Sequence, residues 1–333
     1  MTAVLDTPPD TKSEIAVAPA LRGGSATGLF RVIEVWTVAD GTLSLDSSIY
    51  RDAPATEAEG RTLHFDAGGG LPGRVLADGV PVVFSDLQTE AFARSAAAKA
   101  DGLSAGVGVP VYDDGAITAV VLLLFSSEES AVGAIESWLP DKDRNELRLG
   151  TSYYAGLPRF EMISRYVQFP FGSGLPGEVK QSALPRLLTG LGRSAAFIRA
   201  AGADAEGLSV ALAWPVIEYG DDLRSVLILL SSSAAPLARV MQVWEEDGET
   251  LRPTRNVSER CRPLAEAAAA VEVRSGTGLL GRVWATRRPL ATTDLTEESP
   301  EVQRAAAEAG VTGAIAIPVF RGTDLRGVVA LWG

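Results

Sequence analysis

The 333-residue chain contains a single cysteine, Cys261, and a single histidine, His64. One cysteine excludes an internal disulfide and a cysteine-based zinc cage. One histidine makes a weak case for haem ligation, and a local hydrogen bond within a strand is the simpler expectation for it. No second histidine, cysteine pair or repeated acid–base pair supplies the usual parts of hydrolytic or redox catalysis. We therefore expect a protein that is not an enzyme.

Long apolar runs and basic clusters are also missing. The longest uncharged apolar stretch, residues 116–125, is far shorter than the roughly 20 residues that cross a bilayer, so we expect no membrane partner. With 30 basic against 42 acidic residues, the surface should repel phosphate backbones, and we expect no nucleic-acid partner. Residues 1–27 lack the features of a secretory signal and are predicted to form a flexible N-terminal tail. The expected location is cytoplasmic.

Internal repetition is the main feature that the chain does have. Each copy contains a tryptophan, a glycine signature and a proline: Trp36, Gly70 and Pro110, then Trp138, Gly174 and Pro215, then Trp244, Gly278 and Pro318. The separations are 34, 36 and 34 residues from tryptophan to glycine, and 40, 41 and 40 from glycine to proline. This constancy predicts one module of about 100 residues copied three times, in residues 28–127, 130–233 and 236–333.

Each copy has the pattern of a mixed α+β unit. Asp40-Gly41 is a strong hairpin signal between two alternating strands, and Asp247-Gly248 repeats it in the third copy. After the first glycine signature, Pro72 suits the first turn of a short helix that Gly79 can end. The predicted order is strand, strand, connector, strand, short helix, strand, helix, strand, strand. We expect the three tryptophans to pack in the core.

The glycine signatures also satisfy G-x-G-x-x-G, which leaves a dinucleotide-binding enzyme as an alternative. Asp86 and Asp294 lie 18 residues after the first glycine of their copies, close to where such a fold places its ribose-binding acid. Two features oppose this alternative. The helix after the signature is too short for a parallel crossover, and the tight turns on both sides indicate antiparallel strand pairing.

The segments "GGGLPGRVLADGVPVVFSDL" and "GTGLLGRVWATRRPLATTDL", with the strands that follow them, resemble the second half of a GAF domain. The shared hallmarks are a G-x-G-L-x-G turn, a P-[VL]-x-x-x-D strand and a V-P-[VL] strand followed by a glycine hairpin. The second copy has "LPRLLTGL" where the others have Asp86 and Asp294, and is therefore divergent. The resemblance implies three tandem GAF-like domains, each an antiparallel sheet of five to six strands flanked by helices.

Similar domains bind cyclic nucleotides, bilins, haem or metabolites, and many serve only as dimerisation modules. The Asn-Lys-x-x-x-Phe-x-x-x-Asp-Glu pattern of the cyclic-nucleotide-binding members is absent from all three copies. GAF-type methionine sulfoxide reductases need several cysteines for thiol–disulfide exchange. Cys261 lies upstream of the third glycine signature, whereas bilin cysteines lie in the later pocket helix. No haem, bilin or metal signature results, and the cofactor remains unknown.

The resemblance also suggests a pocket rim. A helix carrying Arg94, Arg199 and Arg304 is expected to overlie the sheet, and an aspartate–arginine pair there could bind a polar ligand. The alternative is that the aspartates are helix N-caps and the arginines are solvated. The candidate ligand-binding residues are Asp86, Arg94, Tyr112, Asp294, Arg304 and Phe320.

The predicted function is that of a non-catalytic sensory or regulatory protein, which binds a small molecule in at least one domain and contacts a regulatory protein partner. The alternative is a scaffold in which side chains fill the pockets. The linkers "SSEES" and "SSSAAP" have no heptad run beside them. A sheet face that long flanking helices would cover must then be covered by a neighbouring copy or by another chain, so we also expect a homo-oligomer.

Overall fold

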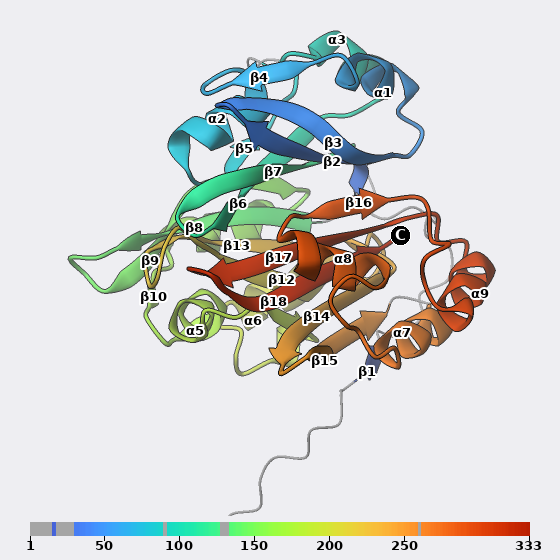
Figure 1. Ribbon diagram of the computed structural model, residues 1–333. Coiled ribbons are helices and arrows are strands. Elements are labelled where there is room, and N and C mark those ends of the chain that lie inside the picture. The colour runs from blue at the N-terminus through green and yellow to red at the C-terminus, as the bar shows by residue number, and fades with distance from the viewer. Residues whose placement is uncertain (1–14, 18–29, 89–91, 127–132, 259–260) are drawn as a thin grey trace, which may run out of the picture.

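The computed structural model describes residues 15–17, 30–88, 92–126, 133–258 and 261–333, and within them the fold is α+β with three six-stranded sheets (Figure 1). The first sheet and its helices comprise β2 (Phe30–Ala39), β3 (Thr42–Tyr50), α1 (Pro54–Gly60), β4 (His64–Asp66), α2 (Gly70–Asp78), β5 (Val82–Phe84), α3 (Ser95–Ala100), β6 (Ala105–Asp113) and β7 (Ala116–Phe125). We call this part the first unit.

The second unit repeats this order of elements. The third repeats it except at one edge of the sheet, where a strand from another part of the chain is found. The second contains β8 (Gly133–Asp141), β9 (Glu146–Ala155), α4 (Pro158–Tyr166), β10 (Phe169–Pro170), α5 (Gly174–Ser182), β11 (Arg186–Thr189), a 3-10 turn η1 (Leu191–Arg193), α6 (Ala200–Ala205), β12 (Leu208–Ile217) and β13 (Leu223–Ser232). The third contains β14 (Val240–Asp247), β15 (Thr250–Ser258), α7 (Arg262–Ala269), α8 (Gly278–Thr286), β16 (Leu290–Thr292), α9 (Pro300–Ala309), β17 (Ala314–Arg321) and β18 (Asp324–Trp332).

The three sheets share one strand order. It is β4-β3-β2-β7-β6-β5 in the first unit and β10-β9-β8-β13-β12-β11 in the second. In the third, β1 (Ile15–Val17) takes the outer place and pairs in parallel with β15, while the other pairs of all three sheets are antiparallel. This strand differs from the predicted flexible tail, because Ile15–Val17 belong to a sheet; residues 1–14 and 18–27 lie outside the described part.

The glycine signature forms a turn that is closed on itself. The N–H of Gly276 donates to the carbonyl of Gly281 at 2.7 Å, and the other two signatures make the same bond. A Cβ added to Gly281 would lie 2.1 Å from the Arg274 carbonyl oxygen, so only glycine lets the helix approach the segment before it this closely. The turn bonds to itself, and the strands next to each signature helix pair antiparallel with their neighbours. The described residues therefore contain no parallel strand–helix–strand unit of the kind found in a dinucleotide fold.

The three sheets pack around a shared central core. One apolar cluster joins their inward faces, with members such as Val107, Val121, Leu212, Leu229, Ile317 and Val329. Strands β6, β12 and β17 contact one another, and one edge strand of each sheet contacts another unit: β5 meets β9, β11 meets β15, and β16 meets β3. The units therefore close a ring with approximate threefold symmetry, in which the first lies above the other two in Figure 1.

This closure bears on the expected homo-oligomer. The sheet face that needed a cover is covered by the other two units of the same chain. The uncovered sheet face on which the expectation rested is thus absent from the described units. Self-association itself stays a prediction.

Each unit also has an outer core beneath its helices. Trp36, Trp138 and Trp244 are fully buried there, one in each outer cluster, as predicted. Among the described helices, none is both long and apolar enough to span a membrane.

Candidate functional site

The outer core of the first unit contains a buried ion pair. Arg94, which precedes α3, donates through Nη1 and Nη2 to the two carboxylate oxygens of Glu34 on β2, each at 2.7 Å. Both side chains are at most 1% exposed. The same carboxylate accepts hydrogen bonds from the Trp36 indole at 2.9 Å and the Tyr50 hydroxyl at 2.5 Å. Burial first, and then the charge of Glu34, raise the pKa of Tyr50. The glutamate is fully bonded from within the protein.

The second unit repeats this pair. Arg199 donates to both oxygens of Glu136, with Nη2 to Oε2 at 2.7 Å, and to the Ser164 hydroxyl at 2.5 Å. Its guanidinium also lies over the rings of four aromatic residues, Trp138, Phe160, Phe169 and Phe197. Burial alone would raise the pKa of Glu136, but the Arg199 charge and its hydrogen bonds outweigh burial, and the pKa lies below its ordinary value.

Among the described residues of the third unit, no such pair occurs. Gln242 lies two residues before Trp244, as Glu34 and Glu136 lie before their tryptophans, and it replaces the glutamate. Val302 lies eight residues before Gly310, as Arg94 lies before Gly102, and it replaces the arginine. The Gln242 Oε1 accepts from the Trp332 indole at 3.1 Å, and among the described residues its Nε2 has no partner.

The predicted alignment of Arg304 with Arg94 is therefore wrong. Arg304 lies two positions beyond Val302 and is exposed on α9, whereas Val302 is fully buried. The helix is ten residues long here and six in α3, so the equivalent position falls inside α9 instead of before it.

The structure does not bring the predicted aspartate–arginine pairs together. Asp86 accepts from the Gln88 N–H at 2.8 Å, and Asp294 accepts from the Thr296 N–H at 3.0 Å and its hydroxyl at 2.6 Å. Both aspartates thus bond to the backbone two residues ahead, but neither is a helix N-cap, because Arg94 precedes α3 and Ser299 precedes α9. The alternative is also wrong for Arg94, which is buried and not solvated. The contacts of Arg94 go to Glu34 and to the Thr56 carbonyl.

The two aromatic candidates lie elsewhere. The Tyr112 hydroxyl donates to the Gly79 carbonyl at 2.9 Å, and its ring belongs to the central core. Phe320 belongs to the outer core of the third unit and lies under the Arg287 guanidinium, 4.2 Å from the ring centroid. His64 makes the expected local hydrogen bond, to Ser44 at 3.0 Å. Cys261 is buried at the start of α7, and burial raises the pKa of its thiol.

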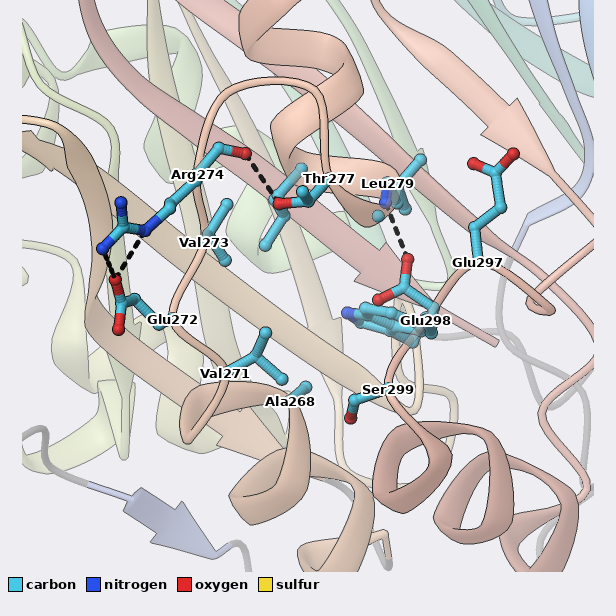
Figure 2. Close-up of a pocket in the computed structure, with 13 residues that line it drawn as sticks. Ala268, Val271, Glu272, Val273, Arg274, Thr277, Leu279, Glu297, Glu298 and Ser299 are labelled. Atoms are coloured by element: carbon cyan, nitrogen blue, oxygen red, sulfur yellow. Dashed lines mark hydrogen bonds and ion pairs between the residues drawn. The ribbon is translucent and has the colours of Figure 1, made fainter.

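A cavity of about 260 Å³ opens in the third unit, and sequence reasoning missed it. It lies between α7, the loop 271–277, the N-terminal end of α8 and the loop 297–299 (Figure 2). Its wall is largely apolar, with Ala268, Val271, Val273, Leu280 and Trp332. The signal in the sequence was a valine, Val302, at the position where the first two units have an arginine. It was missed because Arg304 was aligned with Arg94 instead.

Glu298 is the principal polar group of the cavity. Its Oε1 accepts the Leu279 N–H at the start of α8 at 2.7 Å, drawn as a dashed line in Figure 2. Burial raises the pKa of this carboxyl; the Leu279 N–H acts against the shift, and the charge of Glu297 adds to it. Gly278 has φ of +59°, and a Cβ there would lie 3.2 Å from both Glu298 oxygens. Glycine is therefore favoured here both by the backbone conformation and by the close approach of Glu298.

The other charges at the opening are neutralised in pairs. Arg274 pairs with Glu272 at 2.6 Å, and Arg282 pairs with Glu297 at 2.8 Å. For Glu298 no cationic partner occurs among the described residues. No group of three or more metal-binding side chains occurs within the described ranges either. The cavity therefore combines an apolar wall with one carboxylate whose charge is not balanced, which suits recognition of a small molecule.

Comparison with known proteins identifies the third unit most clearly. Residues 236–333 match the family model of the GAF domain. No curated protein matches the chain. The chain is similar to the solved nlh2 GAF domain of A. aeolicus (19% identity, TM-score 0.25) and to a GAF domain of a phosphoenolpyruvate-protein phosphotransferase from Coxiella burnetii (22% identity, TM-score 0.25). The matches cover 29% and 30% of this chain and 58% and 56% of those chains, so the chain spans little more than half their length.

One comparison corrects the expectation that the chain is not an enzyme. A free methionine-R-sulfoxide reductase from Neisseria meningitidis is also similar, at 18% identity and a TM-score of 0.23, over 29% of this chain and 52% of that chain. A second such reductase, from Thermoplasma acidophilum, matches at 13% identity and a TM-score of 0.23, over 29% of this chain and 62% of that chain. The expectation that the chain is not an enzyme was therefore wrong, because it rested only on missing residue types and structural neighbours of this chain include enzymes.

Proposed function

We propose that the third unit is a GAF-type sensory domain that binds a small molecule in the cavity beside Glu298. We propose that the first two units are GAF-like copies whose corresponding space is filled by an internal arginine. The observation that carries the proposal is the open cavity in the unit whose arginine position is occupied by Val302.

The seventh residue of the first helix in each unit supports this comparison. In α1 it is Gly60, where an added Cβ would lie 2.7 Å from the Arg94 Nη1. In α4 it is Ser164, which accepts a hydrogen bond from Arg199. In α7 it is Ala268, which lines the cavity. The same place in the fold thus faces a guanidinium twice and a cavity once.

Helix α8 supplies a route from the cavity to the rest of the ring. Its N-terminal end is bonded to Glu298, and the residue that ends it, Arg287, forms a double ion pair with Asp113 of the first unit, at 2.7 and 2.5 Å. A ligand that draws the Glu298 carboxylate toward itself would shift the N-terminal end of α8 and change the contact between the third and first units. A regulatory protein partner that contacts this interface would respond to that change.

Thermal-shift screening of a metabolite library on the full chain tests the proposal. We expect at least one compound to raise the melting temperature, because a ligand that binds only the folded state stabilises it. The double variant Gln242→Glu/Val302→Arg should abolish the shift by placing an arginine as in the first unit. The matched control Arg304→Gln, on the exposed side of the same helix, should leave the shift unchanged.

Two results would overturn the proposal. Either no compound shifts the melting temperature, which favours the scaffold alternative, or the shift persists in the double variant, which places the binding site elsewhere.

A further inference from the structure

We infer that the ligand of the third-unit cavity carries a protonated amine on an apolar body, and that Glu298 receives the amine. This inference rests on the proposed function, because it names the class of molecule that the cavity would bind. It follows from the charge of the lining, the shape of the wall and a comparison with the other units.

The charge of the lining favours a cation. Three glutamates and one arginine line the cavity, and the arginine, Arg274, is already paired with Glu272. Glu298 uses Oε1 to accept the Leu279 N–H, and its Oε2 has no partner among the described residues. A carboxylate or phosphate on the ligand would meet this unbalanced charge and be repelled. An ammonium group would form a charge-assisted hydrogen bond with Oε2.

The wall of the cavity favours an apolar body attached to that amine. The side chains of Ala268, Val271, Val273 and Leu280 offer only carbon atoms to a ligand. The indole N–H of Trp332 is already bonded to Gln242, so this side chain offers its ring and no free donor. The volume of about 260 Å³ is roughly nine times the 30 Å³ that a water molecule occupies, which suits a small aromatic or branched amine.

The first two units show that the corresponding space accepts a cation on an apolar stem. There the cation is the guanidinium of Arg94 or Arg199, which bonds to α1 or α4, the helices that correspond to α7 beside the cavity of the third unit. Arg199 in addition packs against four aromatic rings. In the third unit Val302 removes the internal cation, and Glu298 offers a carboxylate from the loop before α9.

Isothermal titration calorimetry of the full chain tests the inference with three probes that share a phenylethyl body and differ in the polar group attached to it. These are 2-phenylethylamine, 2-phenylethanol and 3-phenylpropanoate at neutral pH. We expect the amine to bind about tenfold more tightly than the alcohol, and the carboxylate to bind most weakly, because a hydrogen bond to a charged group is stronger than a neutral one.

Two matched variants locate the amine. Glu298→Gln keeps an acceptor for the Leu279 N–H but removes the charge, and should weaken amine binding about tenfold while leaving the alcohol nearly unchanged. Glu297→Gln removes a charge from the neighbouring position, where the carboxylate is paired with Arg282, and should change amine affinity by about twofold or less.

The outcomes separate this inference from the proposed function. Binding of the alcohol or the carboxylate as tightly as the amine, or amine binding that is insensitive to Glu298→Gln, overturns the amine class and leaves a binding cavity. Failure of all three probes alongside a hit from the metabolite library also overturns the inference alone. Failure of the probes and of the library overturns both.

Discussion

The second and third units fill the space beneath their first helix in two different ways. In the second, Glu136 and Arg199 form a buried ion pair, and the seventh residue of the helix, Ser164, bonds to the arginine. In the third, the corresponding residues are Gln242, Val302 and Ala268, and a cavity opens beside the last of them. One fold therefore supports both a buried ion pair and an open cavity.

The difference shows how two units with the same strand order can differ in their interior through few substitutions. A buried ion pair needs every partner, because removing one leaves an uncompensated charge in the core. A unit that loses both charges together avoids this penalty and is free to keep a cavity. The third unit shows this combination, with an amide and a valine in place of the pair.

Breaking the pair of the second unit should have the largest effect. Arg199→Met leaves Glu136 buried without its cation, and we expect the unfolding free energy to fall by about 3–5 kcal/mol. Urea titration followed by tryptophan fluorescence measures this change. Arg165→Met removes an exposed pair with Glu161 on α4 and should cost about 0.5 kcal/mol or less.

The double variant Glu136→Gln/Arg199→Val sharpens the same test, because it copies the third unit. It should recover a large part of the stability lost in Arg199→Met. A double variant that is less stable than Arg199→Met would contradict the view that the Gln/Val combination can replace the buried Glu–Arg pair.

The ends of the glycine-signature helices give a smaller contrast. Ala183 and Arg287 both end their helices with positive φ, +54° and +58°, a conformation that costs a non-glycine residue about 1 kcal/mol. Ala183→Gly only relieves this strain and should stabilise the protein by up to about 1 kcal/mol. Arg287→Gly relieves the same strain but loses the ion pair with Asp113, so it should be less stable than Ala183→Gly by about 1–2 kcal/mol. Equal melting temperatures for the two variants would show that the contact between the third and first units contributes nothing.

The pH dependence of Glu298 should give the smallest effect. Its pKa is raised in the folded protein, so the folded state binds this proton more tightly than the unfolded state. Protonated Glu298 therefore stabilises the folded state below the ordinary pKa of 4.5, and this contribution to the unfolding free energy is lost as the pH rises through the raised pKa. The melting temperature of Glu298→Gln relative to the native protein should therefore increase from pH 4.5 to 7. In differential scanning calorimetry, a relative melting temperature that falls over this range would contradict the assigned burial.

Several features of the fold could be predicted from the sequence because they depend on local patterns. Alternating strands, hairpin turns such as Asp40-Gly41 and the closed glycine turn gave the antiparallel α+β units. The repeated tryptophans indicated the outer cores correctly. The ring of sheets could not be predicted, since strands that are apolar on both faces do not specify which surface covers them.

The site was harder to predict because its parts are distant in sequence. Glu34 and Arg94 are 60 residues apart, and nothing in either segment indicates the partner of the other. Arg304 was misplaced because α9 is longer than α3, which moved an exposed arginine close to the expected position. Glu298 belongs to an acidic loop whose fold, rather than its composition, brings one carboxylate to the start of α8.

Hydrogen–deuterium exchange of the full chain with and without 2-phenylethylamine, or with a compound found by thermal shift, tests the central claim most directly. The account predicts slower exchange in 271–280 and 297–299 of the third unit, with no slowing beside Arg94 or Arg199. Protection around either of those arginines, or no protection in the third unit with any compound, would contradict it.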